Sequence, residues 1–106
     1  MKASNVSVSD LGFGVGDVVN WGSWDEMEFV RFARIVSVTR RTAKAEVLAT
    51  RNKPYCGMIG RVPYDVPTGE TVTLRVRDGF PGLYVQGTHD VVHHWHGVPV
   101  VYNYIA

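Results

Sequence analysis

The sequence has very little cysteine, no long apolar run and almost no net charge. Cys56 is the single cysteine among 106 residues, so the chain cannot form an internal disulfide, and nothing indicates an oxidising compartment. No apolar run approaches the roughly 20 residues that cross a bilayer, and residues 1–14 lack the apolar stretch of a secretory signal. We therefore expect a cytoplasmic protein that has no membrane partner.

The composition also excludes a disordered chain. Hydrophobic residues make up 45% and charged residues 20% of the sequence, as in an ordinary globular protein. Disorder would require fewer aromatic residues and a net charge further from zero than +1. A length of 106 residues suits one hydrophobic core. We predict one domain over residues 1–106, with a flexible arm over residues 1–11.

The small net charge hides an uneven distribution. Residues 1–30 sum to −4, whereas residues 31–61 sum to +7. Such asymmetry can mark a surface for nucleic acid or for an acidic partner. The alternative is that the acidic and basic segments fold beside each other and cancel.

Short runs rich in valine, threonine and aromatic residues, punctuated by turn residues, predict an all-β fold. The cleanest alternation lies in residues 71–77, where Val72, Leu74 and Val76 point inward. On the other face, Arg75 and Arg77 are expected to point to solvent. The other expected strands are 17–21, 29–39 (with a bulge at 33–35), 42–50, 83–86, 90–95 and 98–104. The last two are expected to form a hairpin that turns at 96–97. About six strands predict a small SH3-like barrel or a rolled antiparallel sheet.

Residues 51–70 are predicted to form a long loop. Pro54, Pro63 and Pro67 cannot donate to a sheet ladder, and three glycines loosen the segment further. Loops of this length in a compact domain are usually functional or mobile. This segment is therefore the first candidate contact surface.

Four histidines crowd into residues 89–96, and imidazole is the commonest metal ligand. On an extended strand His94 and His96 project to one face and His93 to the other. Two ligands on one face are fewer than the three or four protein ligands of zinc sites. His94 and His96 are therefore only weak metal candidates, and we predict no metal and no cofactor.

Motifs for catalysis are lacking as well. Cys56 has no marked base beside it and is expected to be a small buried hydrophobe. The run Gly12-x-Gly14-x-Gly16 lacks the Lys-Ser/Thr of a phosphate loop and precedes a strand rather than a helix. We therefore predict a protein that is not an enzyme, has no catalytic residues and works by binding.

Basic residues near aromatic ones raise the hypothesis of a nucleic-acid-binding barrel. Small barrels bind single strands by stacking bases on aromatic side chains above a positive groove. The candidate nucleic-acid-binding residues are Arg40, Arg41, Lys44, Arg51 and Lys53. The alternative is that these side chains only keep the barrel soluble, because the net charge is far from that of a basic domain.

Two stretches carry a resemblance to other proteins. Residues 15–48 contain a Gly-Asp strand, a Trp-Gly loop and an aromatic-led strand that ends in Val-Thr before a charged turn. Residues 83–102 contain Trp-x-Gly-x-Pro ahead of a tyrosine-bearing strand, with His96 where aspartate is usual. The two stretches cover about half of the chain. They resemble a loosely related set of small phage- and plasmid-encoded proteins.

The resemblance implies a mobile-element setting and transfers no site residue. We therefore predict a phage- or plasmid-encoded accessory protein that binds a host protein in the host cytoplasm, for example as a defence inhibitor. The nucleic-acid-binding barrel is one alternative. The other is a virion or assembly component, a homo-oligomer included, in which Tyr102, Tyr104 and the C-terminal strand pair with a neighbour.

Overall fold

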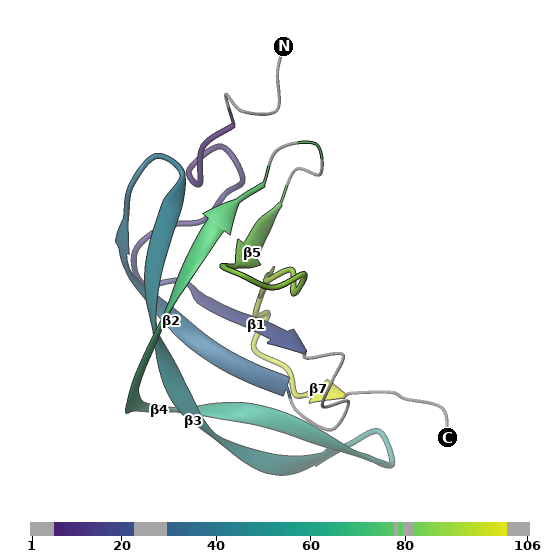
Figure 1. Ribbon diagram of the computed structural model, residues 1–106. Helices are drawn as coiled ribbons and strands as arrows, with labels where there is room; N and C mark the ends of the chain where they lie inside the picture. Colours follow the sequence, from purple (N-terminus) through teal and green to yellow (C-terminus); the bar gives the residue numbers. More distant parts are fainter. Residues whose placement is uncertain (1–5, 23–29, 78, 80–81, 102–106) are drawn as a thin grey trace.

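The computed structural model describes residues 6–22, 30–77, 79 and 82–101, and within these ranges all regular structure is β (Figure 1). The strands are β1 (Val18–Gly22), β2 (Val30–Val38), β3 (Thr42–Tyr55), β4 (Met58–Val76), β5 (Leu83–Val85), β6 (His93–His94) and β7 (Val100–Val101). The predicted all-β fold is confirmed. Across the described ranges, no helix has the length and apolar character needed to cross a membrane.

The strands form one antiparallel sheet that is nearly closed into a small barrel. Its order is β5-β4-β3-β2-β1-β6, with β7 added on β4. The segment 91–95 joins the two ends of this order. The Val92 amide donates to the Leu83 carbonyl of β5 at 2.8 Å, and the Trp95 amide donates to the Val18 carbonyl of β1 at 2.9 Å. The prediction of a small barrel is therefore confirmed.

Alternating apolar positions of the long strands fill the main core. Ala43 and Ala45 on β3 are buried, as are Leu74 and Val76 on β4. The inward face predicted for residues 71–77 is thus confirmed. Buried on this core as well are Val8, Phe13, Val19, Trp21, Ala33, Ile35, Val47, Leu83 and Val92. A second, smaller cluster consists of Val30, Phe32 and Leu48, with Val18, Trp95 and Val100 packed against it.

The predicted flexible arm is wrong for residues 6–11, whereas residues 1–5 lie outside the described ranges. Val8 is completely buried, and its amide donates to the Arg40 carbonyl at 2.8 Å. Arg41 Nη1 donates to the Val6 carbonyl at 2.6 Å. An apolar side chain in the core and these two hydrogen bonds fix the segment on the barrel.

The bulge expected at residues 33–35 lies slightly further along β2. The register against β3 shifts between Ile35 and Ser37. A bulge re-aims the side chains that follow it. Val38, three residues after the buried Ile35, therefore packs against the same core, whereas Val36, which alternation alone would place with Val38, is exposed.

The loop predicted for residues 51–70 is wrong, because these residues continue β3 and β4 as a long hairpin. Its two-residue turn, Cys56–Gly57, has positive φ angles of 51° and 78°, as a type I′ turn requires. Pro63 and Pro67 flank a register shift of the ladder. An interrupted ladder tolerates residues without an amide hydrogen, and this is why the prolines do not end the strand.

Two further local predictions are wrong. Cys56 is exposed at the turn of this hairpin rather than buried. The final hairpin at 96–97 does not form, since β6 pairs with β1 and β7 pairs with β4. Each short strand pairs with an open edge of the sheet, where its backbone amides and carbonyls form hydrogen bonds.

Candidate binding surfaces

The distal part of the β3–β4 hairpin, residues 50–66, projects beyond the barrel and is called the β-arm below (Figure 1). Directly paired residues of an antiparallel ladder share a face. One face of the β-arm therefore carries Arg51, Lys53 and Tyr55 of β3. The same face carries their ladder partners on β4, which are Val62, Gly60 and Met58 respectively. The Arg51 guanidinium lies 5.4 Å from the centre of the Tyr64 ring. This face combines two cations with two aromatic rings.

The opposite face of the β-arm is held by Arg61. Arg61 Nη2 donates to Thr50 Oγ1 at 2.6 Å, and its Nη1 donates to Asn52 Oδ1 at 3.2 Å. These side-chain bonds cross the ladder from β4 to β3. They stiffen the β-arm where it leaves the barrel.

Exposed apolar side chains gather on the β-arm. Of the eight large hydrophobic residues that are exposed in the described part of the chain, five belong to it, namely Tyr55, Met58, Ile59, Tyr64 and Val66. Ile59 is the extreme case, with 70% of its surface exposed. The other three are scattered at positions 15, 36 and 98.

The five residues predicted from sequence to bind nucleic acid do not form one compact surface. Arg51 and Lys53 share a face of the β-arm. Lys44 lies on the barrel part of β3, seven residues from Arg51, which corresponds to roughly 20 Å along a strand. Arg40 and Arg41 lie at the β2–β3 turn, where they hold the N-terminal segment.

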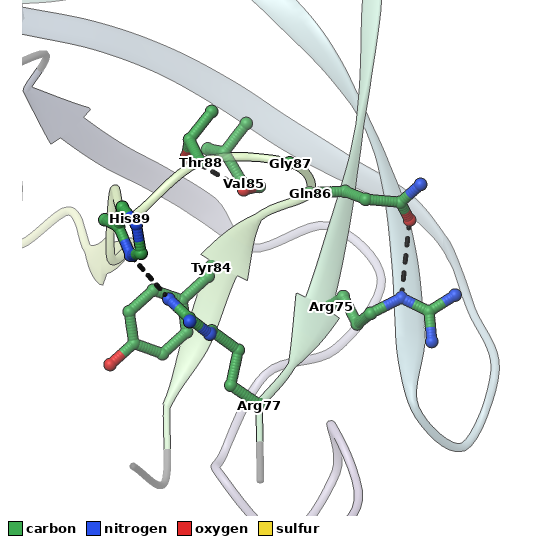
Figure 2. A pocket seen from close by; sticks show the side chains of 8 residues that line it. All are labelled: Arg75, Arg77, Tyr84, Val85, Gln86, Gly87, Thr88 and His89. Carbon is green, nitrogen blue, oxygen red and sulfur yellow. Dashed lines mark hydrogen bonds between the residues drawn. The ribbon is translucent and has the colours of Figure 1, made fainter. Parts of the chain in front are cut away.

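A pocket of about 270 Å³ lies on the outside of the barrel between β4 and β5 (Figure 2). It is lined by Arg75, Arg77, Tyr84, Val85, Gln86, Gly87, Thr88 and His89. Arg75 pairs directly with Tyr84 in the ladder, so alternate residues of both strands meet on this face.

The two arginines of this pocket are held by neutral partners. The Arg77 guanidinium carbon lies 4.9 Å from the centre of the Tyr84 ring, and Arg77 Nη1 donates to His89 Nδ1 at 3.1 Å. Arg75 Nε donates to Gln86 Oε1 at 3.4 Å. Neither guanidinium has a carboxylate within 4.0 Å among the described residues.

Two other arginines of the barrel are paired with acids instead. Arg31 contacts Glu70 at 2.6 Å, and Arg34 forms an ion pair with Asp65. The sequence predicts that Arg75 and Arg77 face solvent, but it does not identify the pocket. That requires the register between β4 and β5, for which the sequence carries no signal.

The histidines do not converge on a shared ligand set. The His94 ring stacks on Phe13 with 4.1 Å between centroids, and its Nε2 lies 3.0 Å from the Gly12 carbonyl. His96 is exposed after β6, and His89 belongs to the pocket beside β5. Within the described ranges, no group of three His, Cys, Asp or Glu side chains could hold a metal. His94 is instead a packing residue.

Tyr102 and Tyr104, the residues predicted for assembly, lie outside the described ranges. The strand expected at 98–104 is seen only as β7, which pairs with Gly60 and Arg61 of β4 in the same chain. Comparison of the sequence and the structure with known protein families, curated proteins and solved structures finds no match.

Proposed function

We propose that this chain is a non-enzymatic binding protein that contacts a protein partner through the β-arm. The observation that carries the proposal is the gathering of exposed apolar side chains on this one projecting element. Several exposed apolar side chains on one part of a small protein are typical of protein–protein contact sites. The two tyrosines and Arg51 add the residue types that are enriched at the energetic centres of such interfaces.

The chemistry of the β-arm also defines the partner. Arg51 and Lys53 lie on the same face as Tyr55, and neither forms an ion pair among the described residues. A partner surface with an apolar centre and acidic groups around it would complement this face. The resemblance of the sequence to small phage- and plasmid-encoded proteins supports a partner from the host, such as a component of a defence system.

Two matched double variants test the proposal. Met58→Ser with Ile59→Ser removes the apolar tip, whereas Val15→Ser with Val98→Ser removes two equally exposed side chains elsewhere. Burial of one large aliphatic side chain is worth about 1.5–3 kcal/mol. The tip variant should therefore bind the partner at least about tenfold more weakly.

The measurement begins with co-purification from host lysate and is completed with the purified partner by calorimetry. The control variant should bind like the unaltered protein. Equal affinity of the two double variants would show that the β-arm is not the contact surface. Arg51→Ala with Lys53→Ala should mainly slow association and reduce its dependence on salt.

Single-stranded nucleic acid is the second candidate, because Arg51, stacked on Tyr64, shares a face with Lys53 and Tyr55. Binding of an oligothymidylate should then weaken steeply with salt. Arg51→Ala with Lys53→Ala should weaken it and flatten the salt slope, whereas Lys44→Ala, roughly 20 Å away, should not. Fluorescence anisotropy measures both effects, and equal slopes for all three proteins would exclude this candidate.

A further inference from the structure

We propose that the pocket between β4 and β5 binds a phosphate group, carried by a small phosphate monoester. The two guanidiniums supply the recognition. An arginine has five N–H donors, and a planar fork of them matches phosphate oxygens. Arg77 uses one Nη1 donor in its hydrogen bond to His89, and Arg75 uses its Nε donor in the bond to Gln86. Most donors of both side chains remain available at the pocket.

The pocket holds Arg77 in place before any ligand arrives. Arg77 is sandwiched by its stacking on Tyr84 and its hydrogen bond to His89. Arginine only donates, so His89 Nδ1 accepts and its proton lies on Nε2. The turn that carries His89 is fixed by Thr88, whose amide and Oγ1 both donate to the Val85 carbonyl, at 3.1 and 2.9 Å. A preorganised set of donors loses little entropy on binding.

Electrostatics favour an anion at this position. Arg75 belongs to β4 and Arg77 directly follows its last residue, Val76, and no described carboxylate pairs with either arginine. Two positive charges that line one pocket without a described carboxylate partner attract an anion to it.

A phosphate fits the two guanidiniums better than a carboxylate does. A carboxylate has two oxygens and one charge, which a single arginine fork satisfies. A phosphate monoester has three terminal oxygens and a charge of about −1.5 to −2 at pH 7. It can therefore accept from Arg77 and, once the Arg75 side chain turns from Gln86 towards Arg77, from both arginines (Figure 2). The volume of about 270 Å³ leaves room for the group that carries the phosphate, beside Tyr84 and Val85.

This site is separate from the proposed protein contact. The pocket lies on the barrel end of β4, whereas the β-arm is formed by the other end of the same strand (Figures 1 and 2). An experiment can therefore refute phosphate binding at the pocket without refuting protein binding at the β-arm, and the reverse.

Nuclear magnetic resonance titrations of the full chain test the site. Inorganic phosphate, phenyl phosphate and acetate are added at matched ionic strength, and the backbone amides of residues 86–89 are followed. Phosphate should shift these amides in a saturable way, and phenyl phosphate should bind at least as tightly. Acetate should bind at least about tenfold more weakly, because it lacks the third oxygen and the second charge.

Single-arginine variants provide the decisive comparison. Arg75→Ala and Arg77→Ala should each weaken phosphate binding about tenfold. Arg31→Ala is the matched control, because the Arg31 guanidinium also lies over an aromatic ring, 5.9 Å from the centre of the Trp21 ring, but is paired with Glu70. It should bind phosphate like the unaltered protein. The proposal is overturned by absence of saturable shifts, by acetate binding as tightly as phosphate, by exclusion of phenyl phosphate, or by an equal loss in Arg31→Ala.

Discussion

Replacement of Gly60 by alanine should disrupt the pairing of β7 with β4. Gly60 is buried in β4, where it pairs with Lys53 of β3 on one side and with Val101 of β7 on the other. A Cβ atom at this position would lie 2.6 Å from Pro99 Cβ and 3.2 Å from the Lys53 carbonyl oxygen. The first distance is far shorter than van der Waals contact, so the segment that contains Pro99 must move.

The cost follows from what that segment contributes. Val100, the residue after Pro99, packs on the second cluster, and its strand satisfies the outer edge of β4. Forcing an extra methyl group into such packing typically costs 1–3 kcal/mol. We expect Gly60→Ala to lower the free energy of unfolding by about 2 kcal/mol. Urea denaturation followed by tryptophan fluorescence measures it.

Two controls isolate the contact. Gly14→Ala adds a methyl group with nothing within 4 Å, so the free energy of unfolding should stay constant or rise by up to about 1 kcal/mol. Pro99→Gly removes the opposing Cβ, and Gly60→Ala should then cost at least about 1 kcal/mol less in that background. If Gly60→Ala is as stable as the unaltered protein, or costs the same in both backgrounds, the described packing of β7 is refuted.

Three further predictions concern single side chains. Cys56→Asn should preserve the free energy of unfolding, whereas Cys56→Val should lower it by about 1 kcal/mol, because the φ of 51° at position 56 disfavours β-branched residues. Equal urea-denaturation midpoints for the two variants would contradict this prediction. His94→Ala should lower the free energy of unfolding by about 1–2 kcal/mol through loss of the stacking on Phe13, and His94→Phe should recover part of it; no loss in either variant would argue against a packing role. Hydrogen bonds from the Ser7 backbone and hydroxyl lower the pKa of Asp10 below its ordinary 3.8, so its contribution to stability is present above that value and is lost as pH falls through the lowered pKa. Carboxyl resonances should show this low midpoint and its return towards 3.8 in Ser7→Ala, in which an unchanged midpoint would exclude the hydroxyl as a cause.

The barrel strands were predictable where one face of a strand is buried and the other is not. Residues 71–77 alternate for this reason, and their inward face is the one observed. The β-arm was not predictable in the same way. Its faces are both largely exposed, so no alternation marks it, and Pro63 and Pro67 indicate a break in any regular ladder. Only the register shift beside them shows how the strand continues.

The candidate sites depend on contacts between segments that are distant in sequence. Arg40 and Arg41 were predicted to face a ligand, but burial of Val8 brings the N-terminal segment onto their turn. The solvent-facing position of Arg77 was predicted correctly, whereas its neighbour Tyr84 follows from a pairing between strands. Local patterns give the exposure of a side chain, and the register gives its neighbours.

The near-closure of the barrel has a consequence for how the chain folds. Both open edges of the sheet are covered by the segment 91–95, and the pair Val19–His94 joins positions 75 residues apart. Pairing over such a separation is slow to form because a long loop must close first. During synthesis on the ribosome, β1 and β5 remain uncovered until this late segment emerges. Unpaired edges are templates for strand addition. Nascent chains, rather than the finished protein, should therefore be the form most prone to aggregation. Rapid folding of the early strands would not prevent this aggregation, because their edges stay unpaired until the segment 91–95 has been synthesised.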